Sequence, residues 1–167
     1  MNNMFCFQCE QTANCTGCTG SAGACGKTAK TAALQDELTG ALVGLARAAE
    51  NNMDLLTQDT HVLVQKALFT CVTNVNFEDD TIEALIREVR AEKNRIVPDC
   101  ALCASPCGHN DDYDMKTLWN AQEDIRSLKS LILFGIRGMA AYAYHASVLG
   151  YREETVDRFF YQALAML

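Results

Sequence analysis

The sequence has few prolines, no long apolar run and no excess of positive charge. Both prolines lie within residues 98–119, which separate two helical regions. The most apolar stretch, residues 131–149, is shorter than a membrane span and is interrupted by Arg137 and His145. The formal net charge of −7 disfavours binding to nucleic acid or to an anionic membrane. We therefore expect neither of these partners.

The N-terminus also lacks a signal peptide, because residues 1–6 have no basic start and no apolar run. We expect a cytoplasmic protein, in a compartment where thiols stay reduced. The chain nevertheless contains nine cysteines, an odd number. Five lie within residues 6–25 and three within residues 100–107, which leaves Cys71 alone. This distribution favours metal binding over a disulfide framework.

From residue 31 onward, apolar residues recur at steps of three and four, and no strand pattern appears. Helices are predicted from Thr31, from about Asp59, after Asp80, over residues 121–149 and from Glu153. The predicted fold is all-α, in four parts. Residues 1–30 form a Cys-rich cluster-binding loop and residues 31–97 a three-helix bundle. Residues 98–119 form a Cys-containing linker, and residues 120–167 an incomplete second helical bundle.

Two capping pairs are predicted, Asp80 with Glu83 and Asn120 with Glu123. The apolar stripe of the helix over residues 121–149 comprises Ile125, Leu128, Leu131, Ile132, Gly135, Met139, Tyr142 and Leu149. The chain ends within the stripe of the last helix, without a stop signal, which predicts a fragment of a longer protein. Helices 121–149 and 153–167 are therefore expected to expose an apolar patch and to self-associate.

Residues 1–30 contain glycines, threonines and cysteines without hydrophobic periodicity, so a metal site is the expected source of order. The motif Cys-x2-Cys-x8-Cys-x6-Cys is formed by Cys6, Cys9, Cys18 and Cys25. Its four thiolates suit an iron–sulfur cluster or tetrahedral zinc. Cys15 also forms a Cys-x2-Cys pair with Cys18. Spacing alone therefore leaves the third ligand open, and it leaves a structural zinc-binding helical scaffold as the alternative function.

Other residues are weighed against plainer interpretations. Cys100, Cys103, Cys107 and His109 could form a second metal site, but a linker with free thiols is the favoured interpretation. Cys71, on an apolar stripe, is predicted to be a core residue. His61 and His145 are predicted to be packing or surface residues. Lys27 is hypothesised to lie near an anionic cluster and to raise its reduction potential.

Several segments closely resemble the hybrid-cluster protein family, the prismane or hydroxylamine reductase family. Near the N-terminus these are residues 5–12 (FCFQCEQT), residues 17–18 (GC), residues 25–28 (CGKT) and residues 34–36 (LQD). Downstream they are residues 123–129 (EDIRSLK) and residues 138–143 (GMAAYA). The resemblance extends through essentially the whole chain.

The resemblance implies an N-terminal domain of two three-helix bundles, followed by two α/β domains that are absent here. The resemblance also implies an iron–sulfur cluster held by Cys6, Cys9, Cys18 and Cys25. In this family the cluster is [4Fe–4S] when the gap between the second and third cysteines is short, and [2Fe–2S] when that gap is longer. The eight-residue gap implies [4Fe–4S]. The last gap has six residues, where short-gap members have five.

The family's activity is also only implied by the resemblance. Its hybrid iron–sulfur–oxygen cluster lies in the later domains and reduces hydroxylamine to ammonia and water. A related role with nitric oxide is proposed for the family. This chain would carry electrons from an unidentified redox donor protein toward that centre. It is expected to hold no catalytic residue of its own and to need the remaining α/β domains.

Overall fold

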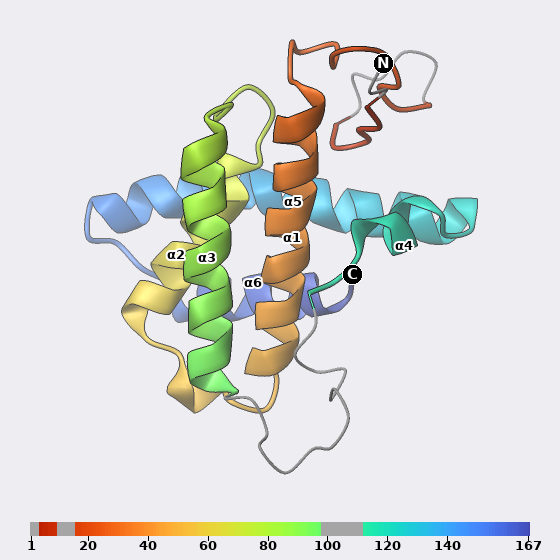
Figure 1. Cartoon of the computed structure of the whole chain (residues 1–167). Helices are drawn as coiled ribbons and strands as arrows, with labels where there is room; N and C mark the ends of the chain where they lie inside the picture. The colour runs from red at the N-terminus through yellow and green to blue at the C-terminus, as the bar shows by residue number, and fades with distance from the viewer. Residues whose placement is uncertain (1–3, 10–15, 98–111) are drawn as a thin grey trace.

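The computed structural model describes residues 4–9, 16–97 and 112–167 (Figure 1). Within these residues the secondary structure is helical, apart from one isolated bridge between Cys6 and Cys18. The elements are α1 (Ala29–Ala49), the 3-10 turn η2 (Met53–Leu55), α2 (Gln58–Thr70), α3 (Asp79–Ile96), α4 (Met115–Trp119), α5 (Glu123–Val148) and α6 (Glu154–Ala165). The predicted all-α fold, with a Cys-rich segment ahead of the helices, is confirmed.

Helices α1, α2, α4 and α6 begin after a residue whose side chain accepts a hydrogen bond from a first-turn N–H, whereas α3 and α5 have no side-chain cap. The Thr28 hydroxyl accepts a hydrogen bond from the Thr31 N–H at 3.1 Å and so caps α1. The two predicted capping pairs are wrong. Helix α3 follows Glu78, and Asp80 lies inside its first turn. Asn120 instead ends α4, because its N–H donates to the Lys116 carbonyl, and α5 starts after Gln122.

One hydrophobic core joins all the α-helices. Helices α1 and α3 lie side by side, whereas α5 runs across them and packs on α2, and α6 packs on α1 (Figure 1). The predicted apolar stripe of α3 is buried in this core, from Ile82 to Ile96. Side chains from α4, α5 and α6 enter the same core, including Leu118, Leu133 and Phe160. The four-part division of the chain stays a prediction.

Helix α5 turns the opposite face toward the core from its predicted apolar stripe. Its buried residues are Ser130, Leu133, Ile136, Arg137 and Ala140. Most of the stripe is exposed instead, with Leu131 at 70% and Tyr142 at 83%. Apolar side chains of α5 are therefore exposed, whereas the predicted patch over residues 121–149 and 153–167 stays a prediction. No described helix is long and apolar enough to cross a membrane.

A short helix, α4, lies within the predicted linker and is attached to the middle of α1. The Tyr113 N–H donates to the Gly40 carbonyl at 3.0 Å. A β-carbon at position 40 would lie 2.2 Å from the Tyr113 carbonyl oxygen. Only glycine allows this close approach of two backbones. The end of the predicted linker is thus fixed to α1 before α5 begins.

Candidate metal centre

Two of the predicted ligands, Cys6 and Cys18, are brought together by backbone pairing. The Cys6 N–H donates to the Cys18 carbonyl at 3.0 Å, and the Cys18 N–H donates to the Cys6 carbonyl at 2.8 Å. The Met4 N–H extends the pairing to the Gly20 carbonyl at 3.2 Å. A segment with little apolar content thus gains a fixed register from these backbone hydrogen bonds.

Gly17 makes this pairing possible. Its φ is +84°, in the left-handed region that favours glycine. A β-carbon there would also lie 3.1 Å from the Cys6 carbonyl oxygen and 3.2 Å from the Phe5 ring. The glycine beside Cys18 therefore allows the turn that returns the chain to Cys6.

The other two predicted ligands lie in the same segment. Cys9 and Cys25 are half-buried free cysteines, as is Cys18, whereas Cys6 is buried. Cys18 borders a cavity of about 400 Å³, where its sulfur accepts a hydrogen bond from the Ala24 N–H at 3.5 Å. Cys9 borders a separate cavity of about 340 Å³. Across residues 4–9, 16–97 and 112–167, no three His, Cys, Asp or Glu side chains group closely enough for a single metal ion. The four-cysteine ligand set stays a prediction.

Gln8, between Cys6 and Cys9, fixes this segment to the helices below. Its side-chain oxygen accepts a hydrogen bond from Lys27 Nζ at 2.7 Å. Its amide nitrogen donates to the Ala32 carbonyl at 2.9 Å and to Asp36 Oδ1 at 2.8 Å, both on α1. Its backbone carbonyl accepts from Arg137 Nη1 at 3.3 Å. We call the connected residues the Gln8 network; they are Gln8, Lys27, Gln35, Asp36, Thr39 and Arg137.

The Gln8 network contains two buried cations. Lys27 and Arg137 are each only 3% exposed. Lys27 Nζ donates to the neutral amide oxygens of Gln8 and Gln35. Arg137 donates to Gln8 and to the Thr39 hydroxyl, at 2.9 Å for the latter. Neither cation forms an ion pair with a carboxylate in the described part of the chain.

Burial shifts the acid–base properties of the groups around these cations. It raises the pKa of the Asp36 carboxyl, although hydrogen bonds from Gln8 and the charge of Arg137 act in the opposite direction. Burial also raises the pKa of the Cys6 thiol, although the hydrogen bond from the Gln8 backbone N–H and the charge of Lys27 act in the opposite direction. Because the Lys27 charge acts on Cys6, the positive charge of the network extends to the cysteine segment.

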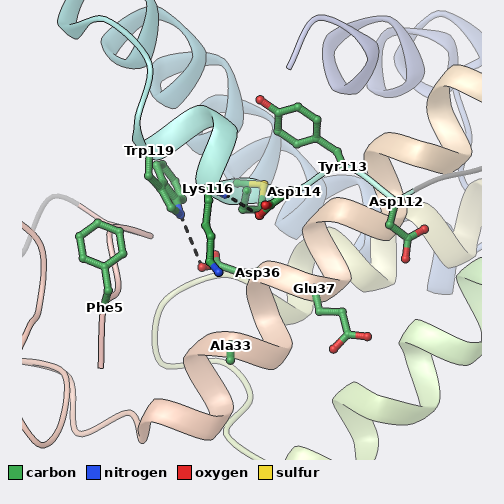
Figure 2. Close-up of a pocket in the computed structure, with 10 residues that line it drawn as sticks. Phe5, Ala33, Asp36, Glu37, Asp112, Tyr113, Asp114, Lys116 and Trp119 are labelled. Carbon is green, nitrogen blue, oxygen red and sulfur yellow. Dashed lines mark hydrogen bonds between the residues drawn. The ribbon is translucent and has the colours of Figure 1, made fainter. Parts of the chain in front are cut away.

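Asp36 also faces a third cavity, of about 420 Å³, between the cysteine segment, α1 and α4 (Figure 2). Phe5 and Trp119 both line it, and the Trp119 indole N–H donates to Asp36 Oδ2 at 3.5 Å. Next to it, the Phe7 ring packs on Trp119 with centroids 5.7 Å apart. Aromatic side chains therefore cover one flank of the cysteine segment.

The remaining predictions have mixed outcomes. Cys71 is 2% exposed and belongs to the hydrophobic core, as predicted. His61 and His145 pack on aromatic rings, His61 on Tyr161 and His145 on Phe69. Cys15 lies outside the described residues. So does the possible second metal site, which comprises Cys100, Cys103, Cys107 and His109.

Sequence reasoning missed the positioning role of Gln8, Asp36 and Arg137. Gln8 and Asp36 were noticed only as parts of the family resemblance. Arg137 was noticed only as an interruption of an apolar stretch. A charged residue in the most apolar stretch of a chain is the signal that could have identified it, since such charges are rarely buried without a partner.

Comparison with known proteins supports the family resemblance. The Prismane/CO dehydrogenase family profile matches residues 4–167. A hydroxylamine reductase of Desulfosudis oleivorans is 37% identical over 97% of this chain and 33% of the relative. One from Methanocaldococcus jannaschii is 38% identical over 98% of this chain and 33% of the relative. The chain thus spans about a third of the length of these relatives. With nearly its whole length matched by the profile, the chain belongs to the Prismane/CO dehydrogenase family.

Proposed function

We propose that this chain is the N-terminal electron-transfer portion of a hydroxylamine reductase. Cys6, Cys9, Cys18 and Cys25 would hold an iron–sulfur cluster, which supplies one-electron transfer when it is bound. The observation that carries the proposal is the backbone pairing of Cys6 with Cys18, in a segment whose Gln8 contacts two buried cations. The short second gap favours [4Fe–4S] over [2Fe–2S].

The types of ligand residue and the charge of the residues around Gln8 both suit an iron–sulfur cluster. The cysteines are free, and thiolates are the ligands that iron–sulfur clusters require. Four thiolates around such a cluster give an anionic site. The Gln8 network contains two buried cations but only one carboxyl group, Asp36, and unbalanced buried charge is unfavourable. Lys27 and Arg137 therefore favour an anionic occupant beside Gln8.

In the whole protein, hydroxylamine would take up two electrons and two protons to give ammonia and water. The relatives are hydroxylamine reductases, which supports this substrate. The electrons would come from a redox donor protein and pass to a hybrid iron–sulfur–oxygen cluster held by the α/β domains. A related reaction with nitric oxide is part of the same proposal. Within this chain, the cysteines would hold the electron-entry cluster, and no residue would be catalytic.

Metal analysis of anaerobically prepared protein tests this proposal. We expect about four iron and four sulfide ions per chain for [4Fe–4S], with a broad thiolate-to-iron absorption band near roughly 400 nm. Two of each would indicate [2Fe–2S] and would correct the cluster type. A colourless protein with stoichiometric zinc and no iron would contradict the proposal and favour the zinc-binding scaffold.

We also propose that the exposed apolar face of α5 is an association surface. In the whole protein, the remaining domains of the same chain would cover it. In the 167-residue chain, a second copy would do so. Its exposed side chains include Leu128, Leu131, Tyr142 and Leu149. A β-carbon at Gly135 or Gly138 would have no atom within 4 Å, so a partner helix could approach closely there.

The double variant Leu131→Glu/Tyr142→Glu should convert self-associated chains to monomers, because paired carboxylates would have to be buried in the contact. Light scattering behind size-exclusion chromatography, over a range of concentrations, measures this. Val75→Glu is the control, since Val75 is an exposed apolar residue that lies in the α2–α3 connection and not on α5. A wild-type chain that stays monomeric at every concentration would contradict self-association.

A further inference from the structure

Arg137 has one donor that the Gln8 network does not use. Its Nη1 and Nη2 groups donate to the Gln8 carbonyl and to the Thr39 hydroxyl. Its Nε has no hydrogen-bond partner among the described residues, although the side chain is 97% buried. A buried, unsatisfied donor is unfavourable, and on a charged group more so. This donor therefore calls for an acceptor, preferably an anionic one.

The cavity beside Arg137 identifies where that acceptor would lie. It has a volume of about 340 Å³, and its lining residues include Gln8, Cys9, Cys71, Phe134, Arg137 and Gly138. Cys9 is one of the four predicted cluster ligands, whereas Cys71 is a core residue whose sulfur hydrogen-bonds to the Gln35 carbonyl at 3.7 Å. Cys9 is the one predicted cluster ligand that lines this cavity, so its iron-bound thiolate is the anionic group expected to face Arg137 there.

We infer that Arg137 is a positioning residue for the iron–sulfur centre, supplied by α5 to a loop 129 positions earlier in the chain. Its guanidinium fixes the Gln8 carbonyl between two ligand cysteines and offers Nε–H and a positive charge to the centre. Hydrogen bonds and charge near a cluster stabilise its reduced, more negative state and raise its reduction potential. This inference rests on the proposed function and adds a residue that sets the potential.

Redox titration of the anaerobically loaded chain, followed by absorbance, tests the inference. Arg137→Gln should lower the midpoint potential, and Arg137→Lys, which retains the charge, should restore most of it. Lys27→Gln should lower it as well, because Lys27 is the second buried cation of the network. Arg158→Gln is the control: Arg158 is an exposed residue of α6, and solvent screens its charge.

A second pair of variants leaves the buried network intact, in case Arg137→Gln does not fold. Gly138 lines the cavity and Gly135 does not, and both positions have open space for a side chain. Gly138→Asp places a negative charge beside Arg137, so it should lower the potential more than Gly135→Asp does. Equal potentials in these two variants would overturn the inference.

Unfolding measurements separate this role from a merely structural one. Arg137→Gln should lower the midpoint of thermal unfolding more in the loaded chain than in the cluster-free chain, and it should weaken cluster binding about tenfold. Equal losses in both states would mean that Arg137 only anchors Gln8 and Thr39, which overturns the inference but leaves the proposed function intact. A wild-type chain that takes up no iron and sulfide would instead overturn the proposed function.

Discussion

Replacing Cys18 by alanine should abolish cluster binding, whereas replacing Cys15 by alanine should leave it unchanged. Cys18 is fixed opposite Cys6 by two backbone hydrogen bonds, and its sulfur already accepts a hydrogen bond from the Ala24 N–H. Alanine has no sulfur to bind iron, so one of four ligands is lost. Iron and acid-labile sulfide per chain, measured after anaerobic reconstitution, report the result.

The same pair of variants decides which cysteine is the third ligand. Spacing alone cannot decide it, because both Cys15 and Cys18 can be counted into a four-cysteine set. Full cluster content in Cys18→Ala, together with loss in Cys15→Ala, would reverse the assignment. Cys71→Ala serves as a further control, since this buried cysteine should affect stability but not the iron content.

Gly40→Ala should destabilise the folded chain by about 1–3 kcal/mol, as expected for overpacking of a tightly filled site. The added β-carbon would lie 2.2 Å from the Tyr113 carbonyl oxygen, and a backbone atom cannot rotate out of the way as a side chain can. Alanine favours a helix over glycine by about 1 kcal/mol, but the clash exceeds this gain. Thermal or urea unfolding followed by circular dichroism measures the difference.

Gly135→Ala is the matched control for this prediction. It is the same substitution inside a helix, but at a position with no atom within 4 Å of the new carbon. At concentrations where the chain is monomeric, it should stabilise the fold by up to about 1 kcal/mol, because only the helix propensity changes. Gly40→Ala and Gly135→Ala are therefore expected to have opposite signs. A Gly40→Ala variant as stable as the wild type would show that the attachment of Tyr113 to α1 is loose.

The buried charges connect the fold to the proposed electron transfer. Lys27 comes from the end of the cysteine segment and Arg137 from the middle of α5, and both contact Gln8. An anionic centre near Gln8 would therefore be stabilised by two separate parts of the chain. If both cations act through their charge, variants of Lys27 and of Arg137 should shift the reduction potential in the same direction.

The sequence by itself was sufficient for the existence of the five longer helices, but α4 falls within the predicted linker. Helix α3 has a regular apolar stripe, Ile82 to Ile96, and its burial follows directly from that periodicity. Capping was less predictable, because α3 and α5 start without a side-chain cap. In α3 the first-turn residue Asp79 instead accepts a hydrogen bond from Thr31 of α1, a contact that the local sequence does not indicate.

Tertiary structure alone decided which face of α5 is buried. This helix is apolar on more than one side, so its stripe of Leu131 and Tyr142 was as plausible a core face as Leu133 and Ile136. The choice follows from packing on α2, which also buries Arg137 beside Gln8, 129 residues away in the chain. Local periodicity determines that a helix is amphipathic, but a long-range contact that orients it has no local signature in the sequence.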